Sequence, residues 1–154
     1  MNQPQSKATL YQRSSVMNDQ KSSYIFVIEG NPIALARPRL NESRFYDAQK
    51  HQKVSVGINL KRDYPHDYLL STALHLDATF YMNIPRTTRH KPNNYHVYKP
   101  DLSNLLKWIE DCLTGVIISD DCIIASTSCH KIYSKQPKTI ITLTLLPETY
   151  GQKD

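Results

Sequence analysis

Residues 74–82 alternate between apolar and polar side chains, and this alternation constrains the fold more than any other segment. A period of two predicts a β-strand with one buried face and one open face. Such a strand needs partner strands and a layer that covers its apolar side. The apolar set is Leu74, Leu76, Ala78, Phe80 and Met82, and the polar set is His75, Asp77, Thr79 and Tyr81.

A segment that follows Pro100 and Asp101 has helical periodicity and suits this covering role. Its apolar residues recur with the i, i+3, i+4, i+7 spacing of an amphipathic helix, and Gly115 follows as a typical C-terminal stop. The segment therefore predicts a helix that packs one face on the strand. The apolar residues are Leu102, Leu105, Leu106, Ile109 and Leu113.

The remaining elements complete a β-β-α-β-α-β-β order. This order predicts a single α+β domain with a mixed sheet packed on two helices. Residues 45–46 should return beside the extended segment 34–40, and the last two strands should form a hairpin through residues 134–137. The other predicted elements are strands at 24–28, 45–46, 122–133 and 139–146 and a helix at 48–62.

The domain should span residues 23–147, between a disordered polar tail at 1–22 and a short C-terminal tail at 148–154. The chain has 154 residues, which is typical of one domain. No apolar run reaches the about 20 residues of a membrane helix, and no signal peptide is evident. We therefore expect a cytoplasmic protein without a membrane association.

Three cysteines without a C-x-x-C spacing favour a reduced protein over a disulfide scaffold. A zinc site at Cys122, Cys129 and His130 is the alternative, but structural zinc sites use four ligands in tight pairs. The net charge of +5 favours a polyanionic partner such as nucleic acid. The alternative for the charge is that it only keeps a basic protein dispersed.

An acidic group follows a basic segment in the middle of the chain. Residues 86–99 are rich in Arg, Lys and His and run directly into Asp101, with Lys107 and the pair Asp120-Asp121 further on. Hydrolysis of a phosphodiester needs an activated water and compensation for charge on the phosphate. Magnesium supplies both and prefers carboxylate oxygens, so acidic residues beside phosphate-binding cations indicate this chemistry.

Each of these residues also has a purely structural interpretation. Asp101 could cap the helix, and Asp120-Asp121 could form an ordinary turn. Lys107 could pair with Asp111 one helical turn later. Ser103 lies on the same helical stripe as Lys107, so its side chain should face the same place.

Several spaced motifs together resemble the RusA family of Holliday junction resolvases. The likeness spans roughly residues 24–146 and is carried by a helix start that is similar to the family's Asp-x-Asp-Asn-Leu-x-Lys motif. The motifs are Lys99-Pro-Asp-Leu-Ser-Asn-Leu-Leu-Lys107, Glu110-Asp111, Leu113, Gly115 and Asp120-Asp121, with Gly30-Asn-Pro32, Arg37-Pro-Arg39 and Tyr46 upstream.

The resemblance implies a homodimeric, Mg²⁺-dependent endonuclease that cuts four-way DNA junctions in recombination and repair. Asp101, Lys107 and Asp121 then match catalytic residues, and the metal ligands would be Asp101, Asp121 and Asp120. The residues expected to contact DNA are Arg86, Arg89, Lys91, Lys99, Arg37 and Arg39.

One position departs from the family motif, because Ser103 replaces its second aspartate. A serine hydroxyl carries no charge and is a weaker Mg²⁺ ligand. Another carboxylate (Asp120, Asp77 or Glu110) could complete the site, the metal could bind more loosely, or the protein could bind junctions without cutting them. We expect retained activity, because Asp101, Lys107 and Asp121 all persist.

Other functions remain as alternatives: a nuclease for flaps or forks, or a basic RNA-binding or ribosome-associated domain. Four further predictions concern single side chains. His130 and Lys131 should be exposed or face DNA, and Trp108 should pack at a helix boundary. Tyr95 and Tyr98 could stack on unpaired bases or anchor the basic loop.

Overall fold

The computed structural model describes residues 22–36, 39–41, 44–85 and 94–147, with backbone alone for 39–41 and 44–46. The two predicted tails lie outside this range, apart from Ser22, whose carbonyl accepts a hydrogen bond from the amide of Leu145. Among the described residues, no helix has the length and apolar character that crossing a membrane requires.

Four strands form the central sheet, in the order β1-β6-β4-β5. β4 pairs in parallel with β5 and antiparallel with β6, and β1 pairs antiparallel with β6, which confirms the predicted mixed sheet. β4 has the central place expected of the strictly alternating segment, since its inward residues are at most 7% exposed. The strands are β1 (Ser23–Glu29), β4 (Leu74–Asn83), β5 (Ile124–Ser134) and β6 (Lys138–Leu145).

The prediction that the last two strands form a hairpin is wrong. β4 lies between them, and Phe80 is opposite Lys131 of β5 on one side and Thr139 of β6 on the other. The connection, residues 135–137, crosses the end of β4. Three residues are long enough for this, because the two outer strands lie only about 10 Å apart. The arrangement gives both edges of the apolar strand a partner.

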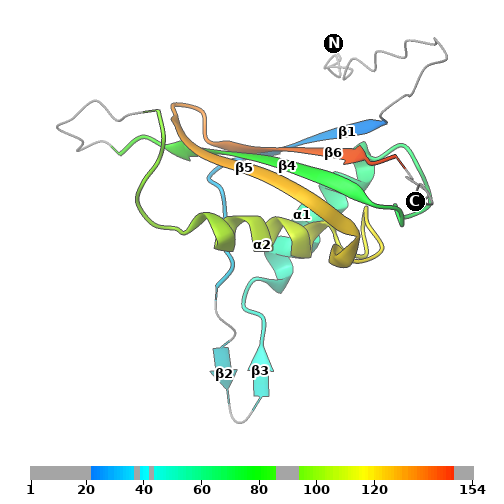
Figure 1. The fold of residues 1–154 in the computed structure, drawn as a ribbon. Helices are drawn as coiled ribbons and strands as arrows, with labels where there is room; N and C mark the ends of the chain where they lie inside the picture. Colours follow the sequence, from blue (N-terminus) through cyan, green and yellow to red (C-terminus); the bar gives the residue numbers. More distant parts are fainter. Residues whose placement is uncertain (1–21, 37–38, 42–43, 86–93, 148–154) are drawn as a thin grey trace, which may run out of the picture.

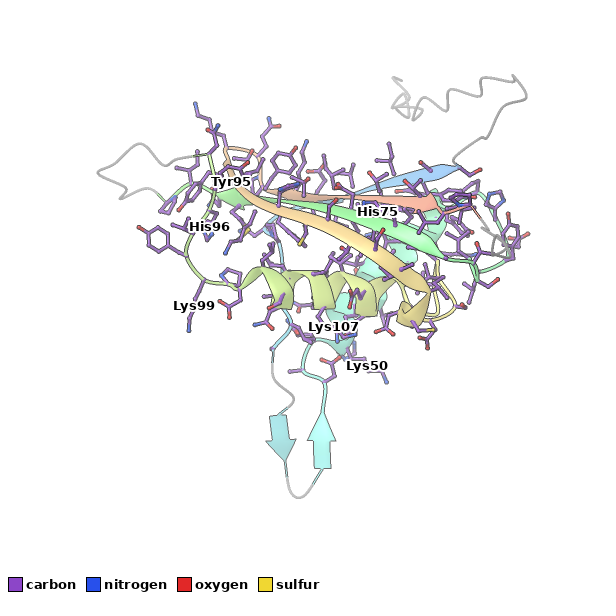
Figure 2. The ribbon with its side chains drawn as sticks, viewed as in Figure 1. Lys50, His75, Tyr95, His96, Lys99 and Lys107 are labelled. Carbon is purple, nitrogen blue, oxygen red and sulfur yellow. The ribbon has the colours of Figure 1, made fainter. Side chains whose placement is uncertain are left out.

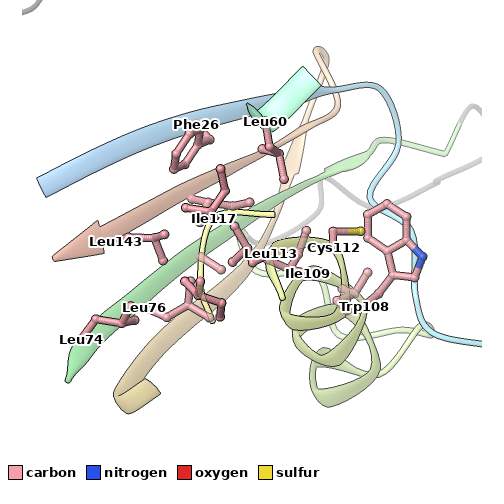
Figure 3. Packing of buried hydrophobic residues seen from close by; sticks show 14 of the residues in the cluster. Phe26, Leu60, Leu74, Leu76, Trp108, Ile109, Cys112, Leu113, Ile117 and Leu143 are labelled. Atoms are coloured by element: carbon pink, nitrogen blue, oxygen red, sulfur yellow. The ribbon is translucent and has the colours of Figure 1, made fainter. Parts of the chain in front are cut away.

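Two helices cover one face of the sheet, as predicted (Figure 1): α1 (Lys50–Asp63) and α2 (Leu102–Leu113). Leu105, Ile109 and Leu113 of α2 are fully buried in the same core cluster as the inward residues of β4 and β6. Figure 3 shows Ile109 and Leu113 with Leu74, Leu76 and Leu143 of these strands. Trp108 is also buried, at 1% exposure, but in the middle of α2 and not at a helix boundary.

α1 packs on the segment after α2 at a glycine. A Cβ on Gly57 would lie 3.3 Å from Cγ2 of Val116, so the position has little space for a side chain. Gly57 weakens the intrinsic helix propensity of α1, but it allows the two segments to approach closely. This packing explains why a helix with a sparse apolar face still forms.

A separate two-stranded sheet projects away from the rest of the molecule (Figure 1). It consists of β2 (Arg39–Asn41) and β3 (Arg44–Tyr46), which confirms the predicted return of residues 45–46 beside the segment 34–40. Gln49 fixes its base: the side-chain oxygen accepts a hydrogen bond from the Ala36 amide at 2.8 Å, and the side-chain nitrogen donates to the Ala34 carbonyl at 2.9 Å.

Candidate active site

Three carboxylates surround the ammonium of Lys107 on α2 (Figure 2 labels Lys107). Nζ of Lys107 lies 2.5 Å from Oδ2 of Asp121, 3.4 Å from Oε2 of Glu110 and 3.9 Å from Oδ1 of Asp111. The Lys107 side chain is 44% exposed. The predicted pairing with Asp111 is therefore present, but Asp121 is the closest partner.

The helix and the turn after it place these groups together. Because the apolar stripe of α2 faces the sheet, the stripe with Ser103, Lys107 and Glu110 faces outward. The chain then turns back through Gly115, whose φ of 74° is a left-handed conformation that glycine adopts without strain. Leu70 fixes this turn, since its amide donates to the Ile117 carbonyl at 2.8 Å. The turn leads to the 3₁₀ helix η1 (Asp121–Ile123) and returns Asp121 to α2.

The electrostatics of this cluster are unbalanced. The hydrogen bond to Asp121 raises the pKa of Lys107; burial acts against it, and Glu110 adds to the rise. Lys107 therefore stays protonated at neutral pH, but one ammonium faces three carboxylates. An excess of negative charge in one place favours the binding of a further cation.

Asp120 is engaged in the turn, as its structural interpretation predicted. It is the N-cap of η1, and Oδ1 accepts a hydrogen bond from the Cys122 amide at 2.9 Å. This backbone hydrogen bond lowers the pKa of Asp120. One of its two carboxylate oxygens is therefore already occupied, although the side chain is exposed.

Asp101 is the N-cap residue of α2, but its side chain makes no capping hydrogen bond. Only its backbone carbonyl takes part, accepting from the amides of Asn104 and Leu105 at 3.2 Å. The structural explanation for an aspartate here is thus not realised. Lys107 follows nearly two turns later, about 9 Å along the helix axis.

Asp77 lies on the other face of the sheet. Its neighbours Leu76 and Ala78 are fully buried beneath the helices, so Asp77 points to the uncovered side. There its carboxylate accepts a hydrogen bond from Ser128. His75 contacts the same serine at 3.3 Å and Ser126 at 2.6 Å. Asp77 is therefore separated from Lys107 by the sheet.

The end of the basic loop is attached to the outer edge of β5. The His96 amide donates to the Lys131 carbonyl at 2.8 Å, and the Tyr133 amide donates to the Asn94 carbonyl at 2.9 Å. Tyr95 and Tyr98 remain 62% and 68% exposed. The backbone of this segment is anchored, while the two tyrosine rings are exposed to solvent. Loop anchoring and base stacking therefore both stay possible roles for this segment.

The predicted DNA contacts are only partly within the described residues. Lys99, two residues before Asp101, is exposed, and His130 is exposed as predicted. Lys131 is half-buried rather than exposed, and its ammonium is bound to backbone carbonyls. Outside the described residues, or described by backbone alone, lie Arg37, Arg39, Arg86, Arg89 and Lys91.

The donor set suits a hard cation better than zinc. In the part of the chain that the structure describes, no three or more His, Cys, Asp or Glu residues gather closely enough to hold a metal ion. Neither the zinc alternative (Cys122, Cys129 and His130) nor the predicted ligand set (Asp101, Asp120 and Asp121) is therefore brought together as a group of three. Glu110 and Asp121 contact the same nitrogen, so their oxygens lie at most about 6 Å apart. Carboxylates at this spacing can bind Mg²⁺ with the help of water.

Such a site, a lysine among carboxylates on a basic α+β domain, suits an enzyme that acts on phosphodiesters, because a fixed ammonium can stabilise charge on a phosphate. Comparison with protein families agrees: the model of the family "Endodeoxyribonuclease RusA" matches residues 29–144. The chain belongs to the RusA family of endodeoxyribonucleases, which acts on branched DNA junctions. It is also similar to the uncharacterised protein YqaN of Bacillus subtilis (strain 168), with 22% identity over 133 residues that cover 77% of this chain and 93% of YqaN.

One part of the site was not predicted from the sequence. Nζ of Lys53 on α1 lies 2.7 Å from Oδ2 of Asp47 and 2.9 Å from Oδ2 of Asp111. Asp111 therefore contacts both Lys53 and Lys107. Lys53 and Asp111 are 58 positions apart, and no local pattern connects them.

Proposed function

We propose that this protein is a Mg²⁺-dependent endonuclease that resolves four-way DNA junctions in recombination and repair. The observation that carries the proposal is the cluster of Lys107 with Asp121 and Glu110, on a chain of the RusA family. Asp101 and Asp121 bind the metal, and Asp101, Lys107 and Asp121 are the catalytic residues. Asp120 supports Asp121 from the adjacent turn position.

The donor chemistry fits Mg²⁺. Magnesium prefers a few carboxylates together with water and substrate phosphate oxygens. Glu110 and Asp121 are carboxylates that contact the same ammonium, and Asp101 is exposed at the start of the same helix. When bound, Mg²⁺ polarises the phosphate and lowers the pKa of a coordinated water. The excess negative charge around Lys107 supports a cation at this place.

Lys107 acts on the substrate through its charge. Its ammonium stays protonated because of its hydrogen bond to Asp121, and its side chain is open to solvent. A fixed positive charge beside the scissile phosphate stabilises the negative charge that develops in the transition state. The carboxylates hold the ammonium in position for this role.

Glu110 takes the part of the aspartate that Ser103 replaces. Of the three carboxylates considered, Asp77 lies on the opposite face of the sheet, and Asp120 already accepts a backbone hydrogen bond. Glu110 lies on the helical stripe of Ser103 and Lys107 and contacts the Lys107 ammonium. Titration of Mn²⁺ followed by electron paramagnetic resonance tests this: Glu110→Gln should bind Mn²⁺ more weakly than the wild type.

The anchored segment next to Asp101 binds the DNA. Lys99 and the basic residues of the loop, Arg86, Arg89 and Lys91, contact flanking phosphates, which set register and not sequence; Arg37 and Arg39 extend this surface. The open rings of Tyr95 and Tyr98 stack on unpaired bases at the junction. A homodimer with two related sites matches the two opposing strands of a four-way junction.

A second candidate function is junction binding without cleavage. Ser103 favours it, because the family motif has lost one carboxylate. A mobile four-way junction with Mg²⁺, assayed for cleavage and for gel shift, separates the two functions. Cleaved product supports the endonuclease, whereas a gel shift with intact DNA supports the binding protein. Flap, fork and RNA competitors in the same assay rank the other substrates.

A further inference from the structure

The structure assigns a positioning role to Lys131 of β5, and this inference rests on the proposed function. Nζ of Lys131 donates to the backbone carbonyls of Tyr98 and Pro100, with both distances at 2.6 Å. Pro100 directly precedes Asp101. We propose that Lys131 fixes the entry into α2 and thereby holds the Asp101 carboxylate in its productive place.

The contact is specific in geometry. An ammonium has three donors and no acceptor, and Lys131 uses two of them on carbonyls that are two residues apart. The Tyr98 and Pro100 carbonyls precede the helix and take no part in its hydrogen bonds, and a hydrogen bond from a charged ammonium is stronger than one from a neutral donor. Lys131 is half-buried, which limits competition from water.

The backbone next to this contact is ordered by the same strand. The amide of His96 and the carbonyl of Asn94 pair with β5, and the His96 ring packs on Tyr133 at 4.8 Å between ring centroids. The segment 94–96 thus pairs with β5 at the edge of the sheet. The Lys131 ammonium extends this attachment beyond the last backbone pair, up to Pro100, the residue before the N-cap of α2.

The start of α2 needs a restraint from elsewhere, because the Asp101 side chain does not cap the helix. The side chain makes no capping hydrogen bond, so the carboxylate does not lock the start of α2. A carboxylate that is not used for capping keeps both of its oxygens free for a metal ion. Lys131 supplies the missing restraint from the neighbouring strand and leaves the Asp101 carboxylate for the metal.

The test replaces Lys131 by Met, which keeps most of the stem and removes the donors. Lys135→Met is the matched control, since Lys135 is exposed in the following turn and loses the same charge. We expect Lys131→Met to lower kcat on a four-way junction about ten- to a hundredfold, because a small displacement of a catalytic group has effects of this size. Its junction Kd should stay within about threefold of that of Lys135→Met. Lys131→Arg, which keeps the charge and the donors, should restore most of kcat.

Hydrogen exchange gives a readout that does not depend on cleavage. In Lys131→Met the amide of His96 should exchange at least tenfold faster than in Lys135→Met, while the amides paired within β4 and β6 stay unchanged. Normal exchange at His96 together with unchanged kcat would overturn the proposal, as would a loss of junction affinity without a loss of kcat. If Lys131→Met does not fold, Lys131→Gln, which keeps one donor group, is judged by the same criteria.

The two proposals fail in different ways. If the wild type does not cut any junction, the proposed function fails, but the exchange result still shows whether Lys131 fixes the segment. If the wild type cuts and Lys131→Met cuts equally well, the positioning role fails alone.

Discussion

Lys53 on α1 and Lys107 on α2 contact the same carboxylate, Asp111, but they differ in surroundings. The Lys53 side chain is 16% exposed and lies between two carboxylates, which it ties together. The Lys107 side chain is 44% exposed and faces three carboxylates, which leaves negative charge in excess. A covered lysine that ties two carboxylates together is a structural link, whereas a more exposed lysine that faces three carboxylates is available to a metal ion and a phosphate.

The structural link has a clear position. Lys53 joins Asp47, at the base of the β2–β3 sheet, to Asp111 of α2. Burial lowers the pKa of Lys53, but the hydrogen bonds to Asp47 and Asp111 outweigh this, and the net effect is a raised pKa. The same contact lowers the pKa of Asp47.

Replacing Lys107 should have the largest effect. Lys107→Ala should lower kcat on a four-way junction about 1,000-fold, since it removes a fixed charge from the transition state. The melting temperature should change little, because the three carboxylates are partly exposed and can be hydrated. Single-turnover cleavage with a gel-shift control measures this, and retained cleavage would mean that Lys107 is another structural lysine.

Replacing Glu110 should have the next largest effect. Glu110→Gln should raise the Mg²⁺ concentration for half-maximal cleavage about tenfold, because a ligand charge is lost while the size of the side chain is kept. Asp63→Asn is the matched control, with the same change of charge on α1. An unchanged Mg²⁺ requirement would show that Glu110 does not take part in the metal site.

Replacing Lys53 should affect stability more than catalysis. Lys53→Met should lower the free energy of unfolding by about 1–3 kcal/mol, because two partly covered carboxylates lose their cation. Lys50→Met, at an exposed position of the same helix, is the control. Denaturant unfolding measures both, and kcat should fall less than tenfold. A loss of activity as large as that of Lys107→Ala would erase the distinction between the two lysines.

The pKa shifts predict how the stability difference between the wild type and Lys53→Met depends on pH. The raised pKa of Lys53 means that its stabilising effect is complete below about pH 10 and is lost as pH rises further. The lowered pKa of Asp47 means that the effect is complete above about pH 4 and is lost as pH falls. The gap between wild type and Lys53→Met should therefore be widest between these limits.

Ser103→Asp should have the smallest effect on its own. If Glu110 already completes the site, the added carboxylate should change the Mg²⁺ requirement by less than about threefold. In the Glu110→Gln background the same substitution should restore most of the lost Mg²⁺ affinity, a coupling that a double-mutant cycle measures. Additive effects of the two substitutions would contradict a shared role.

Much of the fold could be predicted from local patterns. The alternation at 74–82 and the helical spacing at 102–113 predicted the two elements that pack together in the core. The pairing of β5 with β4 could not be predicted, because a short connection between two strands normally indicates a hairpin. Which edge of β4 each strand takes is decided by long-range packing.

The candidate site shows the same division. The sequence predicted Lys107 and Asp121 as catalytic residues, and the structure places their side chains in contact. From the sequence, Asp77, Asp120 and Glu110 were all possible replacements for the carboxylate missing at Ser103. Only the structure shows that Asp77 lies on the other face of the sheet. The role of Lys131 could not be predicted either, since a lysine on a strand shows no sign that its ammonium reaches carbonyls from residues 98 and 100.

The central claim is that Asp101 and Asp121 serve one metal-dependent cleavage site. Its most direct test is cleavage of a mobile four-way junction in Mg²⁺ by the wild type, Asp101→Asn and Asp121→Asn. We predict that all three bind the junction and that only the wild type cuts it. A wild type that binds without cutting, or variants that cut as fast as the wild type, would contradict the claim.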